Sequence, residues 1–453
     1  MHSTITIKHG NEKLVSQSGL LPVGALLEYM QLAKRLKIIP GVHCVDPTIP
    51  HGDILSSMIG LICTGKSDYS SIEIFREDQW FFTKALGISA CPSQSTLRQR
   101  IDLIGESANK ILKDASAAMI REKAPAISGI KTSAGYFIPL DIDVSPFDNS
   151  KTQKEKVSRT YKNFDDYAPI LAYLGNEGYL VDLKLREGKQ HCQKNTPEFI
   201  RETLTYVREI TQLPVLVRLD SGNDSQDNFI IGDEFQNIHF LVKRNLRKEP
   251  LKAWLELAQN TDNTTCTRYN NKTVWIGQTL TGIKGNSLPH SITFKVTERY
   301  EKKGELLMFP ELEVETYWCT LSDLPPGEVI NLYHDHGTSE QFHSEIKSDL
   351  GVERFPSCHF ASNSLILHLT LLAYNILRII GQTSIEGQND EPLPCNRHKQ
   401  VTRRRLRTVM QDLIYMAGRL IYSSRQWFIS FGIINPFARL ADRVLQRLRY
   451  CPG

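Results

Sequence analysis

The chain has 453 residues, 41% hydrophobic and 23% charged, which is ordinary for a soluble protein and long enough for two or three domains with cores of their own. The formal charge of +4 is unevenly distributed, because residues 397–453 carry twelve Lys or Arg against two Asp. Nine scattered cysteines without a CxxC pair indicate a reduced cytosolic compartment rather than an oxidising one.

Neither secretion nor a membrane is indicated by the apolar segments. The first residues, MHSTITIKHGNEK, lack the apolar core of a signal peptide. The longest apolar segment, residues 364–381, contains His368, Asn375 and Arg378. We therefore expect a buried helix there, no membrane span and a cytoplasmic location.

Residues 1–130 have helical patterns throughout and are predicted to form a helical domain. Within it, residues 82–102 resemble a helix-turn-helix, with an apolar helix, a break from Gly87 to Pro92 and a second helix begun by a serine. The second helix carries Arg98 and Arg100, which would contact DNA in a major groove. An ordinary helix hairpin is the alternative, but the position suits a domain that binds DNA ends.

Strand-like runs replace the helical pattern from residue 136 onward. Three such runs come first, followed by a helix, a fourth strand, a shorter helix and a fifth strand. We expect the strands at residues 136–146, 167–175, 178–188, 213–220 and 238–244, and the longer helix at 196–211. This order is that of the ribonuclease H-like fold, so residues 131–244 are predicted to be the first part of an α/β catalytic core.

Two carboxylates stand at the ends of predicted strands. Asp143 lies near the end of the first strand and Asp220 at the end of the fourth, and these strands are neighbours in a ribonuclease H-like sheet. Ligands of open α/β sheets bind at such strand ends. Asp141 is the competing candidate, because it lies on the same face of the strand as Asp143, further from the end.

Residues 245–325 contain alternating segments typical of strands, so we predict a mostly β insertion that forms a wall beside the active site. Trp318 in this block is a candidate for stacking on an unpaired base, whereas Trp275 is expected to fill a core. Lys243 and Arg244, at the end of the fifth strand, are candidates for holding DNA phosphates, against the alternative of a plain surface.

Residues 326–385 are predicted to contain the catalytic and core helices. One face of the first helix would present His336, Glu340, His343 and Lys347, which follow one another at spacings of four, three and four. Gly337 within this helix indicates a local break or a close approach of DNA backbone. Glu345 is a rival to Glu340, but it lies well off the same helix face.

The last region, residues 386–453, is predicted to be helical and basic. Its densest charge is at residues 403–407, and Arg404 is taken as a DNA contact. Clustered Lys and Arg gain affinity for phosphate backbones by releasing counterions, so double-stranded DNA is the expected partner and the nucleoid the expected place. A solvated helix face is the alternative.

Asp143, Asp220 and Glu340 are candidates for a metal site. Carboxylate oxygens suit hard divalent cations, and two such cations stabilise the attacking and leaving oxygens of an in-line phosphoryl displacement. We therefore expect two Mg²⁺ ions, for which Mn²⁺ would substitute. A zinc or di-iron site that uses His343 is the alternative, but no second helix offers a matching Glu-x-x-His set.

Several separated segments resemble the DDE transposases of bacterial insertion sequences. Their catalytic helix has Tyr, two residues, Arg, three residues, Glu, six residues, Lys, and Tyr333, Glu340 and Lys347 fit that spacing. The segments most similar to the insertion-sequence family numbered thirteen-eighty are DVSPFDNSKT, YAPILAYLG, VRLDSGND, KRNLRK and YHDHGTSEQFHSEIK. The chain departs from the signature at His336, because histidine is a weaker and pH-dependent phosphate contact than arginine.

The resemblance implies an enzyme that binds the terminal inverted repeats of its element, cuts them with two metals and joins the 3′ ends to target DNA. It implies that Asp143, Asp220 and Glu340 bind the metals and that Tyr333 and Lys347 contact DNA. Synapsis of two ends implies a homodimer. A metal-dependent nuclease without strand transfer and a non-catalytic DNA-binding regulator are the alternative functions.

Overall fold

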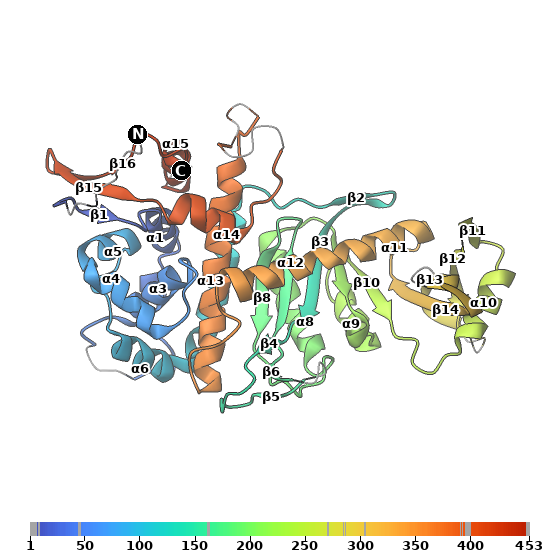
Figure 1. Cartoon of the computed structure of the whole chain (residues 1–453). Coiled ribbons are helices and arrows are strands. Elements are labelled where there is room, and N and C mark those ends of the chain that lie inside the picture. The colour runs from blue at the N-terminus through green and yellow to red at the C-terminus, as the bar shows by residue number, and fades with distance from the viewer. Residues whose placement is uncertain are drawn as a thin grey trace. The chain divides into compact units, whose positions relative to one another are not determined.

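A computed structural model of the chain forms two compact units (Figure 1). We call residues 1–125 together with 345–453 the helical unit, and residues 126–344 the sheet unit. The structure describes residues 7, 10–43, 47–160, 164–269, 271–283, 285, 287–302, 305–389, 391, 393–394 and 400–449. The division differs from the predicted domains, because the predicted block at 326–385 is split between the two units.

The helical unit is mostly α-helical, as predicted for residues 1–130. Its helices are α1 (Leu20–Tyr29), α2 (Leu32–Arg35), α3 (His51–Ile62), α4 (Glu73–Glu77), α5 (Gln79–Leu86), α6 (Gln94–Ile104), α7 (Asn109–Lys123), α13 (Phe360–Ile385), α14 (Leu406–Val409) and α15 (Ala438–Arg449). The expected break is present, since α5 ends at Gly87 with φ of 68° and the Ser93 hydroxyl accepts from the Thr96 amide at 3.2 Å to start α6.

Helix α13 is the central helix of this unit. Its 26 residues are long and apolar enough to cross a membrane, but the whole of its apolar window is buried inside the protein. Contacts with α3, α6, α7, α14 and α15 surround it. The expected buried helix is therefore confirmed, and a core position accounts for the composition of α13.

The predicted all-helical C-terminal region was wrong in one segment. Strands β15 (Gly418–Ser423) and β16 (Gln426–Phe431) form a hairpin there, and β1 (Leu14–Val15) pairs with β15. Positive φ at both residues of the two-residue turn, Ser424 and Arg425, is typical of a hairpin turn. The β-branched and aromatic residues of this segment favour strand over helix.

The sheet unit is built on a large mixed sheet (Figure 1). Its central strands are β3 (Gly135–Val144), β7 (Ile170–Leu174), β8 (Tyr179–Lys184), β9 (Val215–Leu219) and β10 (Ile238–Arg244), at the predicted places. They are ordered β8-β7-β3-β9-β10, with β3, β7 and β8 antiparallel to one another in turn and β9 and β10 parallel to β3. Helix α8 (Thr196–Ile210) connects β8 to β9, and α9 (Gln226–Asp233) connects β9 to β10.

The inserted block continues the same sheet. Strand β14 (Glu305–Cys319) pairs with β10, and β13 (Ser287–Lys302), β12 (Lys272–Thr281) and β11 (Thr265–Tyr269) follow outward in that order. Helix α10 (Leu251–Asn260) packs on this extension, with Trp254 and Trp275 in a common apolar cluster. Trp275 is a core residue, as expected.

The predicted catalytic helix is interrupted in the structure. Helix α11 (Pro326–His334) is followed by a 3₁₀ turn (Asp335–Thr338) that contains Gly337, and then by α12 (Ser339–Ser344). Val329 and Leu332 of α11 pack on Leu216 and Leu241 of the sheet. The local break expected from the glycine is therefore present, and apolar packing holds α11 on the sheet face that bears the acidic residues.

Candidate active site

The register of β3 on β9 brings the two aspartates together. Asp141 pairs with Arg218 and Ile142 with Leu219 across these parallel strands, so the next positions along the register are Asp143 and Asp220. Side chains two residues apart in a strand lie on one face, which is also the face covered by α11. The first and fourth predicted strands thus deliver both carboxylates to one sheet edge.

The electrostatics of the two carboxylates differ. Burial raises the pKa of Asp220, and the nearby charge of Asp143 raises it further. Burial also acts to raise the pKa of Asp143, but the hydrogen bond and charge of His343, the charge of His336 and the Val144 amide lower it overall. Asp220 therefore carries the energetic cost of two neighbouring like charges.

His343, which was predicted to share a helix face with Glu340 but was given a role only in the alternative transition-metal site, is a member of this site. Its Nε2 lies 3.3 Å from Oδ2 of Asp143, and its Nδ1 lies 3.2 Å from the Tyr173 hydroxyl. Nε2 can donate to Asp143, and Nδ1 can either accept from or donate to the Tyr173 hydroxyl, so both contacts are satisfied. The spacing of seven residues between His336 and His343 was the signal that could have identified it.

Glu340 is exposed in the first turn of α12, one helical turn before His343. The 3₁₀ turn advances about 120° per residue instead of about 100°, which changes the face on which Glu340 emerges relative to His336. Among the residues that the structure describes, no three His, Cys, Asp or Glu side chains form a ready metal-binding group. The structure thus assembles Asp143 with Asp220, and leaves Glu340 at the rim.

Both rival carboxylates have partners of their own. Asp141, only 2% exposed, accepts two hydrogen bonds from Arg218 at 2.6 and 2.7 Å. Glu345, in the helical unit and 1% exposed, accepts from Arg378 and from Arg403. Each of these two carboxylates is already paired with arginine, which favours Asp143 over Asp141 and Glu340 over Glu345 as candidate ligands.

Tyr333 and His336 lie on the site side of α11. Burial and the charges of Asp220 and Asp143 raise the pKa of Tyr333, and the amine of Lys243 lies 5.9 Å from the centre of its ring. His336 is 7% exposed and its Nδ1 contacts Oδ1 of Asp141 at 2.8 Å. This burial leaves His336 little surface to offer DNA, in contrast to its predicted role.

Three further basic residues were predicted to contact DNA, one in the catalytic signature and two at the end of the fifth strand. Lys347 is half-buried in a π-helical turn (Glu345–Asp349) of the helical unit. Lys243 lies 3.9 Å from Glu315, and Arg244 makes two hydrogen bonds to Glu249 at 2.8 and 2.5 Å. Arg244 is thus partly neutralised by a neighbour within its own unit.

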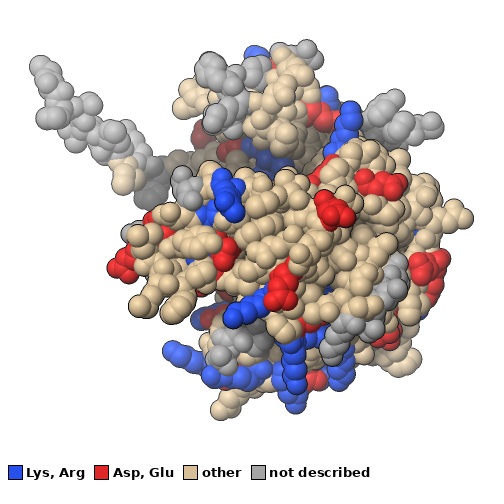
Figure 2. All heavy atoms as spheres, turned by 90° about the vertical axis from the view of Figure 1, so that its right-hand side faces the viewer, with Lys and Arg blue, Asp and Glu red and all other residues tan. Residues whose placement is uncertain are grey.

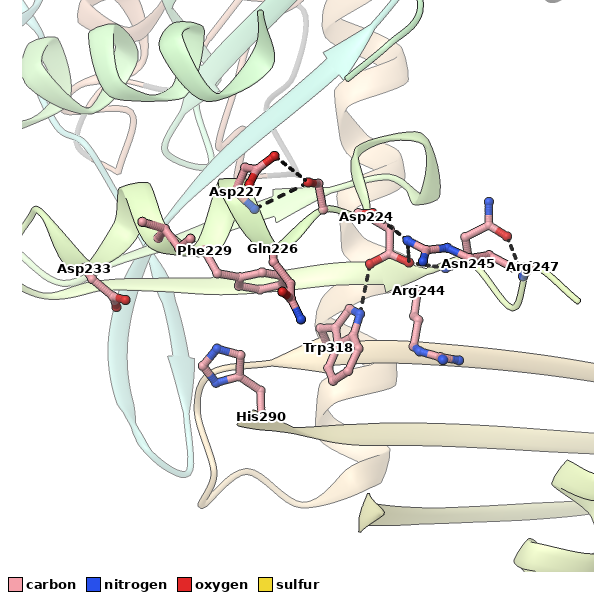
Figure 3. A pocket seen from close by; sticks show the side chains of 12 residues that line it. Asp224, Gln226, Asp227, Phe229, Asp233, Arg244, Asn245, Arg247, His290 and Trp318 are labelled. Atoms are coloured by element: carbon pink, nitrogen blue, oxygen red, sulfur yellow. Dashed lines mark hydrogen bonds and ion pairs between the residues drawn. The ribbon is translucent and has the colours of Figure 1, made fainter. Parts of the chain in front are cut away.

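A pocket of about 770 Å³ is lined in part by residues that follow Asp220 in the sequence (Figure 3). The indole of Trp318 donates to Asp224 at 2.9 Å, and Phe229 and His290 line the same pocket. Arg247 at its margin is 72% exposed, while the Arg244 guanidinium lies 5.5 Å from the Trp318 ring centre. Aromatic faces beside cationic side chains suit a planar base with an attached phosphate.

The predicted basic contacts of the helical unit fall into two kinds. Arg98 is exposed on α6, and Arg100 lies 3.0 Å from His51. Arg404, by contrast, is 5% exposed and donates to Asp412 and Ser384. Its predicted DNA contact does not agree with the structure, because a buried guanidinium with these partners cannot reach a phosphate.

Surface charge is also unevenly placed on the face drawn in Figure 2. Lys and Arg gather toward its lower edge, whereas Asp and Glu are scattered and much of the face is uncharged.

Comparisons with known proteins give a family and distant structural likenesses. The family model described as transposase DDE domain, group 1, matches residues 1–452. The chain matches no curated protein. A cryo-EM structure of a piggyBac transposase synaptic complex with hairpin DNA is 8% identical, with 95% of this chain and 82% of that chain covered and a TM-score of 0.42, too remote to bear on the site.

Proposed function

The chain belongs to the transposase DDE domain group 1 family, which makes it an enzyme that cleaves and transfers DNA, and we propose that it acts on the ends of its own insertion sequence. It would bind the terminal inverted repeats, cleave them by phosphodiester hydrolysis and join the 3′ ends to target DNA. The observation that carries this proposal is the position of Asp143 and Asp220, one residue beyond the last paired residues of the adjacent strands β3 and β9, where the charge of Asp143 acts on Asp220.

The proposed core is ribonuclease H-like, and the proposed subgroup is the insertion-sequence family numbered thirteen-eighty. Support for the fold comes from the strand order β8-β7-β3-β9-β10, with two antiparallel pairings and then two parallel ones. Support for the subgroup comes from Tyr333, Glu340 and Lys347, whose spacing fits its signature.

In this proposal Asp143 and Asp220 would hold two divalent cations, with Glu340 joining them when the helix turns it inward. Two neighbouring carboxylates repel each other and are stabilised when a cation binds both. The raised pKa of Asp220, caused in part by Asp143, agrees with such repulsion. Bound Mg²⁺, or Mn²⁺ in its place, would supply Lewis-acid stabilisation of the attacking and leaving oxygens. Glu340, at the rim and one turn from His343, would complete the ligand set from the helix.

His343 would orient Asp143 without touching DNA itself. Its contacts with Asp143 and Tyr173 fix one carboxylate oxygen toward the helix, while the other oxygen accepts from the Val144 amide at 2.7 Å and keeps a lone pair for a ligand. Groups that hydrogen-bond a ligating side chain set its direction and basicity. Tyr333 and Lys243 would then bind phosphates near the scissile bond, and Lys347, in the helical unit, would also contact DNA.

DNA contacts further from the chemistry would come from three places. Trp318 and its pocket would take an unpaired base near the cut, with Arg244 and Arg247 beside it. Arg98 and Arg100 on α6 would bind the end sequence in a major groove. Exposed arginines of the C-terminal region would add sequence-independent affinity, and buried Arg404 is left out of this role.

The proposed working form is a homodimer that holds two duplex ends and a target duplex. Such an enzyme would act in the cytoplasm, at the nucleoid. Two protomers are needed because each of the two ends must be cut and joined in a coordinated way.

The test is cleavage and strand transfer on a labelled duplex that carries the element's terminal inverted repeat, with Mg²⁺. The variants are Asp143→Ala, Asp220→Ala and Glu340→Ala, and exposed Asp335→Asn is the matched control. Loss of cutting in the three variants, with DNA binding retained and the control active, supports the proposal. Cutting without any joined product would instead support a nuclease, and cutting by any of the three variants would remove that residue from the site.

A further inference from the structure

We propose that Asp141, Arg218 and His336 form a buried positioning unit that sets the spacing of Asp143 and Asp220 and seats the catalytic helix over them. None of the three would bind metal or DNA. The inference rests on the proposed function and explains what three charged or titratable side chains do beneath the site.

The first step is the register of the two strands. Asp141 and Arg218 are direct partners across β3 and β9, two residues behind Asp143 and Asp220 respectively. Their side chains are both 3% exposed and are joined by two hydrogen bonds, at 2.6 and 2.7 Å. A slip by one residue would turn one strand's side chains to the opposite face and break this pair in a dry interior.

The second step is the link from the strands to the helix. Arg218 also donates from Nη1 to the carbonyl of Leu332 at 2.9 Å, near the end of α11. His336, in the 3₁₀ turn that follows, contacts Asp141 through Nδ1 at 2.8 Å. The pair that fixes the strands therefore also holds the end of α11 and the turn that interrupts the helix, and through that turn the approach of Glu340 and His343.

The hydrogen bonds of Asp141, Arg218 and His336 leave these side chains unable to bind a ligand. Asp141 has both oxygens committed to Arg218 and one also to His336, and Arg218 uses three nitrogens on Asp141 and Leu332. A side chain with these bonds cannot leave them for a ligand without leaving a buried charge uncompensated. His336 therefore replaces the signature arginine as an internal link rather than as a phosphate contact.

The test measures Mn²⁺ binding to the full chain by electron paramagnetic resonance, together with Mg²⁺-dependent cleavage of the labelled end. The triple variant Asp141→Leu, Arg218→Met, His336→Phe removes all three groups, and Arg201→Ala with Glu234→Ala removes an exposed ion pair of the same unit as control. We expect the triple variant to bind Mn²⁺ at least about 10-fold more weakly and to cleave at least about 10-fold more slowly. His336→Gln, which keeps a hydrogen-bonding partner for Asp141, should retain both properties within a factor of about three.

Wild-type Mn²⁺ affinity in the triple variant would overturn the inference. If the triple variant does not fold, His336→Phe decides, because it leaves the Asp141–Arg218 pair in place, and unchanged Mn²⁺ affinity and cleavage in it would overturn the link to the helix. A wild type that binds no Mn²⁺ would overturn the proposed metal site and this inference with it. A wild type that binds Mn²⁺ but does not cut would contradict the proposed function alone.

Discussion

Two groups of carboxylates in this chain, one buried and one half-buried, differ in what neutralises them. In the helical unit, Glu345 is bonded to Arg378 and Arg403, and Asp349 to Arg405 at 2.7 Å. In the sheet unit, Asp143 and Asp220 have a histidine, an asparagine and a backbone amide as hydrogen-bonding partners. The first group is balanced by the chain's own arginines, whereas the second faces a like charge.

If the proposed function holds, the difference separates carboxylates that stabilise the fold from carboxylates that bind metal. A buried carboxylate held by arginine has its counter-ion built in, and removing one partner leaves the other unsatisfied. A pair of carboxylates that destabilise each other is stabilised by a cation from outside. The dense arginines at 403–407 look like a DNA-binding stretch in the sequence. In the structure, however, Arg403, Arg404 and Arg405 are paired with carboxylates of the chain itself.

The largest expected effect comes from removing a functional charge. Asp143→Asn or Asp220→Asn should lower the rate of DNA-end cleavage by about 10⁴-fold or more, since losing one member of an interdependent catalytic set removes most of the activity. The folded state should be kept, because no buried cation loses its partner. Single-turnover cleavage and thermal melts of the same preparations measure the two properties. If either variant unfolds, the substituted aspartate is needed for the stability of the fold, which would contradict the assignment.

Removing a structural charge should do the reverse. Glu345→Gln should lower the free energy of unfolding by about 3–5 kcal/mol, because buried Arg378 loses its carboxylate. The same change at exposed Glu340 should alter stability by less than about 0.5 kcal/mol. Denaturant unfolding of the full chain compares the two. Equal effects at both positions would contradict the assignment of Glu345 as structural.

His343 gives a smaller effect and tests whether it orients Asp143. His343→Phe should raise the Mg²⁺ concentration needed for half-maximal cleavage by about 10–100-fold, because a ligating carboxylate loses the group that directs it. His343→Gln should recover part of that loss by hydrogen bonding. The Mg²⁺ dependence of the cleavage rate is the measurement, and a change in maximal rate alone would argue for a different role.

The smallest effect concerns pH and stability without divalent cations. The folded-state pKa of Asp220 is raised, so its contribution to stability is fully present below its unfolded pKa and is lost as pH rises through the folded pKa. Asp220→Asn should therefore be slightly more stable than wild type at neutral pH, with the difference vanishing in acid. Thermal melts across that range in a chelator check the sign. A variant less stable at neutral pH would mean that the Asp220 carboxylate is already compensated.

Much of the core could be predicted from sequence because its patterns are local. The fifth strand was placed at its observed bounds, Ile238–Arg244, and Asp143 was preferred over Asp141, which the structure shows to be held by Arg218. The hairpin at Gly418–Phe431 was missed because charge composition was given more weight than β-branched and aromatic content.

The features that could not be predicted depend on contacts distant in sequence. The local sequence around Arg404 does not show that its side chain is buried or that Ser384, twenty residues earlier, accepts from it. His343 reaches Asp143 across 200 residues, and His336 reaches Asp141 across 195. The angular offset between His336 and Glu340 arises from a 3₁₀ turn whose exact length a single glycine does not determine.

The most direct test of the account is to locate Mn²⁺ by anomalous diffraction in crystals of the full chain bound to its cleaved DNA end. The account predicts Mn²⁺ between the carboxylates of Asp143 and Asp220, with Glu340 turned in from the rim as a further ligand and Asp141 still on Arg218. Mn²⁺ bound at Asp141, or bound without Asp143 or Asp220, would contradict it.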